Sequence, residues 1–133
     1  MFERMQFHHV GIACENIDET ACHYCSLGYD QSETVIDPLQ NVKIAFLSHP
    51  EMPMIELLSP VNNASPVVDI LKKNGTSPYH ICYSVSDLDG TIALFRRKRY
   101  IIVSKPKIAN ALGGKRVAFL YNKAVGLIEL VGE

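Results

Sequence analysis

Four residues of the chain have side chains that can bind a divalent metal, and they occur as two equivalent pairs. His9 and Glu56 form the first pair, and His80 and Glu129 form the second. Each histidine lies near the start of an alternating apolar segment, and each glutamate stands inside the apolar run Ile-Glu-Leu. A glutamate on a buried strand is unfavourable unless its charge is paired or it binds a metal. Two imidazoles and two carboxylates suit one divalent ion of nickel, cobalt, zinc, manganese, iron or magnesium.

The glutamates belong to a segment that occurs twice in the chain. Phe46-Leu47 and Ile55-Glu56-Leu57 recur as Phe119-Leu120 and Ile128-Glu129-Leu130, with every equivalent position 73 residues further on. The histidines repeat as well, at an offset of 71 residues. A single histidine or strand glutamate is more often an ordinary hydrogen-bonded residue than a ligand. The repetition of both favours a metal site.

The elements expected in each module are a strand, a helix and three further strands. Periodicity and turn residues place the strands of the first module near residues 6–14, 31–37, 42–48 and 53–58. They place those of the second near residues 79–85, 100–104, 115–121 and 126–131. Asn16 is expected to cap the first helix, and Ser86 or Asp87 the second. A short helix over residues 67–73 is expected between the modules.

The alternation of side chains along a strand decides whether the four candidate ligands can meet. His9 points away from the apolar Val10 and Ile12, and Glu56 points away from Ile55 and Leu57. The same holds for His80 and Glu129 in the second module. If the apolar residues face the helices, all four polar side chains project from the opposite, concave face.

The predicted fold is therefore α+β, with two βαβββ modules that form a curved mixed sheet around one metal site and with the helices outside. A module of about 60 residues is too small to be stable alone. We expect one domain over residues 1–133, with module one at about 6–59, a linker and short helix at about 60–76, and module two at about 77–131.

Bulk properties exclude some classes of function. The formal net charge of −1 provides no electrostatic footprint for nucleic acid. No apolar stretch approaches the length that spans a membrane. The cysteines lack a disulfide spacing, which predicts a cytoplasmic protein. Within the first helix, Cys22 and Cys25 are expected to pack into the core.

The chain resembles the vicinal oxygen chelate superfamily, which includes glyoxalase I, methylmalonyl-CoA epimerase and bleomycin-resistance proteins. The resemblance covers nearly the whole chain, and it is carried by His9-Val10-Gly11-Ile12-Ala13, Ile55-Glu56-Leu57-Leu58-Ser59-Pro60, Tyr79-His80-Ile81-Cys82 and Gly126-Leu127-Ile128-Glu129-Leu130. It implies that His9, Glu56, His80 and Glu129 bind one divalent metal ion that chelates two neighbouring oxygens of a substrate. It also implies a homodimer.

Within that superfamily, residues 59–66 and 106–117 are more similar to the epimerases. Epimerases have a second catalytic glutamate in the turn where this chain has Leu39. The glutathione-dependent lyases have an arginine and an asparagine where this chain has Ala13 and Pro60. Both departures leave the choice between epimerase and lyase open.

The function expected is a metal-dependent isomerase or epimerase, or a lactoylglutathione lyase-like lyase, that transfers a proton next to a carbonyl. Its substrate would have vicinal oxygens, as in an acyl-CoA thioester or a hemithioacetal. A non-catalytic small-molecule-binding protein of the resistance type is the alternative. By resemblance, Glu129 is the first candidate for the base. Glu56 is the candidate for the opposite face, in place of the glutamate missing at Leu39, and Asp37 or Glu33 is held in reserve as the base. Lys115 and Arg116 are candidates for contacting an anionic part of the substrate, although a solvated loop explains them equally well.

Overall fold

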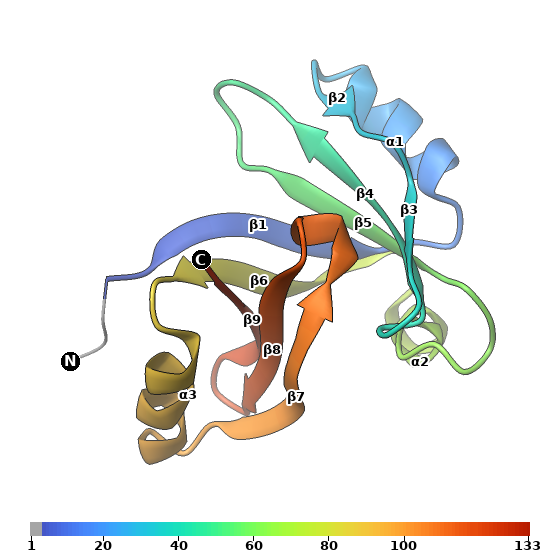
Figure 1. The fold of residues 1–133 in the computed structure, drawn as a ribbon. Helices are drawn as coiled ribbons and strands as arrows, with labels where there is room; N and C mark the ends of the chain where they lie inside the picture. Colours follow the sequence, from blue (N-terminus) through green and yellow to red (C-terminus); the bar gives the residue numbers. More distant parts are fainter. Residues whose placement is uncertain (1–3) are drawn as a thin grey trace. The chain divides into compact units, whose positions relative to one another are not determined.

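The computed structural model describes residues 4–133 (Figure 1), and the chain divides into two compact units. One unit contains residues 9–79, and the other contains residues 4–8 together with residues 80–133. The boundaries therefore lie within two strands, β1 (Gln6–Ala13) and β6 (Ser77–Val85).

The first module has the expected strand–helix–strand plan. After β1 come α1 (Ile17–Cys25), β2 (Asp30–Gln31), β3 (Val35–Asp37), β4 (Val42–Ser48), β5 (Ile55–Pro60) and α2 (Val67–Asn74). The strand order is β2–β4–β5–β1, with β3 also pairing with β4. Strands β1 and β5 are parallel, whereas β4 and β5 are antiparallel.

The core of the first module lies between α1 and one face of its sheet. Asn16 begins the helix because its side-chain oxygen accepts a hydrogen bond from the Glu19 N–H at 3.0 Å. The buried side chains of this core come from all the main elements: Ile12, Cys14, Ile17, Ala21, Tyr29, Ala45, Leu47, Ile55 and Leu57. Alternation then directs His9 and Glu56 to the other face of the sheet.

The second module repeats the plan. Strand β6 is followed by α3 (Leu88–Arg97), β7 (Ile101–Ala109), the 3₁₀ helix η1 (Asn110–Leu112), β8 (Lys115–Asn122) and β9 (Gly126–Gly132). The strand order is β6–β9–β8–β7, with β6 and β9 parallel. Asp87 caps α3 by accepting a hydrogen bond from the Gly90 N–H. The helix packs on the sheet through Val85, Leu88, Ile92, Phe95, Ala118, Leu120, Ile128 and Leu130, and Met5 joins this core.

The α+β class and the two βαβββ modules are confirmed, and several strands differ from expectation in their bounds. The strand expected over residues 31–37 is two short strands, because Ser32 interrupts the pairing. Its hydroxyl oxygen accepts a hydrogen bond from the Phe46 N–H at 2.8 Å, a bond that a backbone carbonyl would otherwise accept. Strand β5 continues to Pro60, and strand β7 continues to Ala109.

Strand β7 tolerates a proline because it lies at the edge of its sheet. Its pairing with β8 shifts register between Ile102 and Ser104 and again between Ser104 and Lys107, the interval that contains Pro106. A proline has no N–H to donate to a neighbouring strand, so edge strands and bulges accommodate it.

Two smaller features concern the helices. Cys22 and Cys25 are exposed on α1, so the expectation that they pack into the core was wrong. Ile17, Ala21 and Tyr24 form the side of α1 that faces the core. Cys22 follows Ala21 and Cys25 follows Tyr24, so each cysteine is rotated by about 100° around the helix axis, away from the core. Among the described residues, no helix is long and apolar enough to cross a membrane.

Candidate functional site

The first histidine–glutamate pair is built by two neighbouring parallel strands. The register places Gly11 of β1 opposite Glu56 of β5. Because Gly11 has no side chain, the carboxylate can reach along the strand to His9. The distance between His9 Nε2 and Glu56 Oε1 is 3.2 Å, and both residues are almost fully buried.

The second pair has the same construction. Strands β6 and β9 are parallel, and the small Cys82 lies opposite Glu129. The distance between His80 Nε2 and Glu129 Oε1 is also 3.2 Å, and both side chains are buried. Each module therefore contributes one buried imidazole beside one buried carboxylate, as the sequence repeat predicts.

A phenylalanine completes each pair, and sequence reasoning did not assign it a role. In the antiparallel register, Phe46 of β4 lies opposite Glu56, and Phe119 of β8 lies opposite Glu129. The ring centroids of Phe46 and His9 are 5.6 Å apart in an edge-to-face arrangement. The repeated Phe-Leu at the start of the duplicated segment was the available signal.

The geometry of each pair fits a metal-binding half-site. Two donor atoms about 2.1 Å from one ion and at right angles to each other lie about 3 Å apart, close to the 3.2 Å between the nitrogen and the oxygen in each pair. The same distance also suits a hydrogen bond from an imidazole N–H to a carboxylate. Buried nitrogen and oxygen donors of this kind suit the divalent ions expected from the sequence.

The reserve candidates for the base have different surroundings. Asp37 is buried, but its Oδ1 accepts hydrogen bonds from the N–H groups of Leu39 and Gln40 at 3.1 Å. Its Oδ2 accepts a hydrogen bond from the Gln40 side-chain amide at 2.8 Å. Asp37 therefore stabilises the turn between β3 and β4. Glu33 is exposed, and the Leu39 side chain is 59% exposed on that turn.

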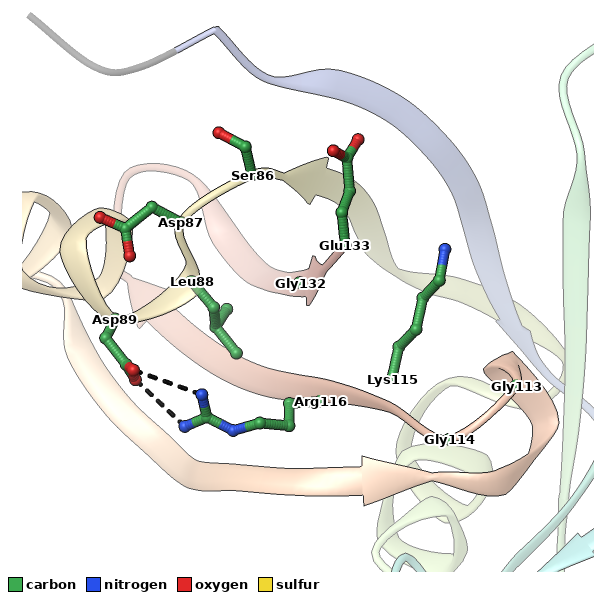
Figure 2. Close-up of a pocket in the computed structure, with 10 residues that line it drawn as sticks. All are labelled: Ser86, Asp87, Leu88, Asp89, Gly113, Gly114, Lys115, Arg116, Gly132 and Glu133. Carbon is green, nitrogen blue, oxygen red and sulfur yellow. Dashed lines mark hydrogen bonds and ion pairs between the residues drawn. The ribbon is translucent and has the colours of Figure 1, made fainter.

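Lys115 and Arg116 lie beside an open groove of about 450 Å³ within the second module (Figure 2). Arg116 donates two hydrogen bonds to the Asp89 carboxylate, at 3.1 and 3.3 Å, and these bonds hold the pKa of Asp89 below its usual range. The Lys115 side chain points away from this ion pair (Figure 2). Both residues were predicted to contact an anionic part of a substrate. Arg116 already has a carboxylate partner in Asp89, whereas the Lys115 side chain is directed away from that carboxylate.

Comparison with known proteins adds a family and a set of relatives. The family model described as the Glyoxalase/Bleomycin resistance protein/Dioxygenase superfamily matches residues 8–119. This range includes His9, Glu56 and His80. It ends within β8, ten residues before Glu129.

Two curated relatives are named as epimerases. The chain is 35% identical over 130 residues to the mitochondrial methylmalonyl-CoA epimerase of Dictyostelium discoideum, covering 94% of this chain and 76% of the relative. It is 31% identical over 122 residues to the ethylmalonyl-CoA/methylmalonyl-CoA epimerase of Cereibacter sphaeroides, covering 89% of each.

A solved structure with a bound ligand is also similar. It is a methylmalonyl-CoA epimerase of Streptomyces coelicolor, a glutamate-to-leucine variant in complex with 2-nitronate-propionyl-CoA. The TM-score is 0.83 at 29% identity, and the match covers 96% of this chain and 94% of the other.

Proposed function

The chain belongs to the Glyoxalase/Bleomycin resistance protein/Dioxygenase superfamily, and we propose that it is a metal-dependent epimerase acting on an acyl-CoA thioester. The observation that carries the proposal is the buried histidine–glutamate pair, repeated with the same 3.2 Å separation in both modules. The names of the relatives support the epimerase over the lyase. Ala13 is fully buried and apolar, and Pro60 has no side-chain donor, so neither offers a contact to glutathione.

The proposed metal ligands are His9, Glu56, His80 and Glu129, sharing one divalent ion. Support comes from the equivalence of the two pairs and from the donor set, which gives two imidazole nitrogens and two carboxyl oxygens. Such an ion, when bound, supplies Lewis-acid stabilisation of negative charge on a carbonyl oxygen.

The proton transfer is assigned to the carboxylates of the chain. In the proposal, Glu129 in its ionised form removes the proton next to the thioester carbonyl, and Glu56 in its protonated form gives a proton to the opposite face. Each carboxyl group returns to its starting state by proton exchange with solvent after product release. Both side chains are buried, which keeps water from competing as the proton donor. A base must lie within hydrogen-bond reach of the carbon, about 2.6–3.2 Å, in the bound substrate. Lys115 is the proposed contact for an anionic part of the substrate.

The experiment that tests this function is solvent deuterium exchange. Purified protein loaded with cobalt or zinc is incubated in deuterium oxide with one enantiomer of methylmalonyl-CoA, and both exchange and inversion are followed. Exchange that stops on chelation and returns with metal supports the epimerase. Tight binding of the thioester without exchange would instead indicate the non-catalytic binding protein.

Leu39 provides a second prediction, because epimerisation needs an acid or base on each face of the carbon. Replacing Leu39 with glutamate is expected to raise the rate of inversion about tenfold. This is less than the roughly hundredfold or more that a well-placed acid or base provides, because the introduced side chain is not held in place by neighbouring residues. The side chain is exposed, and only its backbone N–H bonds to Asp37, so the turn should be retained.

Leu39→Gln is the matched control, since glutamine has the shape of glutamate without its proton chemistry. Inversion is measured by chiral chromatography of the recovered thioester. If Leu39→Glu and Leu39→Gln invert at the same rate, position 39 does not face the reacting carbon.

A homodimer and a cytoplasmic location stay predictions from the sequence.

A further inference from the structure

We infer that Phe46 and Phe119 are positioning residues that hold the two ligand imidazoles in the orientation needed for metal binding. The inference rests on the proposed metal site. It extends each half-site from two residues to three, supplied by three neighbouring strands: β1, β5 and β4 in the first module, and β6, β9 and β8 in the second.

The contacts are equivalent in the two modules. The ring centroids are 5.6 Å apart for His9 and Phe46 and 5.3 Å apart for His80 and Phe119, with interplanar angles of 72° and 87°. Each phenylalanine is also the cross-strand partner of the glutamate in its own pair. One aromatic side chain therefore lies beside both members of each pair.

An imidazole needs such a contact because its side-chain torsion χ2, which sets the plane of the ring, has only a weak intrinsic preference. Rotation of the ring would turn Nε2 away from the neighbouring carboxylate oxygen, which lies at 3.2 Å in both pairs. An edge-to-face contact favours one ring plane over the others. In many metal sites a hydrogen-bonded outer partner of the histidine has this orienting role, and losing it weakens metal binding about tenfold to a hundredfold. The aromatic contact is inferred to act in the same way at the lower end of this range.

Two comparable edge-to-face pairs among residues 4–133 lie away from the histidine–glutamate pairs, and these provide controls. Tyr24 and Tyr29 pack at 5.8 Å in the first module, and Phe95 and Tyr100 pack at 4.7 Å in the second. Tyr24 and Tyr100 are half-buried, like Phe46 and Phe119. Their replacement with leucine removes an aromatic contact of the same kind while leaving both histidines untouched.

The test compares Phe46→Leu and Phe119→Leu with Tyr24→Leu and Tyr100→Leu. Cobalt(II) is titrated into each protein, and its visible absorption spectrum is recorded. Each phenylalanine variant is expected to bind cobalt about tenfold more weakly and with a shifted spectrum. The tyrosine variants should keep the wild-type affinity and spectrum. Phe46→Tyr and Phe119→Tyr retain a ring and should restore both properties.

Thermal unfolding of the metal-free proteins separates positioning from loss of stability. If the phenylalanine and tyrosine variants lose similar stability but only the former lose cobalt affinity, the positioning role is supported. Unchanged cobalt affinity and an unchanged spectrum in both phenylalanine variants would overturn it.

A measurement without metal distinguishes failure of this inference from failure of the proposed function. In the metal-free protein, the ¹⁵N shifts of the His9 and His80 rings report tautomer and ring environment. The leucine variants at 46 and 119 are expected to change the shifts of the adjacent histidine alone. If wild-type protein binds no cobalt, the metal site is refuted, and these ring shifts still decide whether the phenylalanines orient the imidazoles.

Discussion

Replacing Glu129 with glutamine should reduce deuterium exchange at least about a hundredfold while leaving metal bound. The size follows from the usual loss on removing a general base. Glutamine keeps the volume of the side chain and a carbonyl oxygen for the ion, so the half-site with His80 should be retained. Exchange is measured by mass spectrometry of the thioester, and metal content by elemental analysis of the same sample.

Glu51→Gln is a matched control for this substitution, because Glu51 is exposed in the connection between β4 and β5. It should exchange protons at the wild-type rate. Should Glu129→Gln also do so with its metal in place, Glu129 would be only a ligand. The base would then be Glu56 or Glu33, since Asp37 has both of its oxygens engaged in a turn.

Removing one donor from either pair should weaken metal binding about a hundredfold or more. Outer partners of metal ligands already account for tenfold to a hundredfold in affinity, and a direct ligand should account for at least as much. Glu56→Ala and His80→Ala test one residue from each module. Both are measured by competition of the protein with a chelating dye for zinc.

The matched controls are Glu51→Ala and His23→Ala, which alter the same residue types at exposed positions. Glu56→Gln is included because it keeps the volume of a buried side chain, in case the alanine variant does not fold. If Glu56→Gln and His80→Ala both bind zinc with wild-type affinity and stoichiometry, the metal lies elsewhere.

The sequence was sufficient to predict the fold class and both histidine–glutamate pairs. The reason is that two independent periodicities agree at these positions. The internal repeat identifies equivalent residues, and the alternation along each strand places the polar member of each apolar run on the face opposite the helix. Each pair is therefore specified by local sequence and by the pairing of two neighbouring strands.

Features that depend on side-chain contacts across strands could not be predicted in the same way. The break at Ser32 depends on a single hydroxyl that replaces a backbone acceptor. The contact of Phe46 with His9 depends on the pairing register of β4 with β5, which cannot be read from the sequence. Arg116 was a candidate for contacting an anionic ligand because of the loop in which it lies, and its ion pair with Asp89 could not be predicted because the two residues are 27 positions apart in the chain.

The proline in β7 has a consequence for solubility. This edge strand exposes Ile101, Val103 and Ile108, side chains that would favour the addition of a strand from another molecule. Such an addition needs a regular row of backbone donors and acceptors along the open edge. Pro106 removes one donor from that row, the register shifts bend it, and the charged Lys105 and Lys107 flank it. These irregularities therefore oppose edge-to-edge pairing along β7, and within this strand the stretch around Ile101 and Val103 is where intermolecular β-pairing would begin.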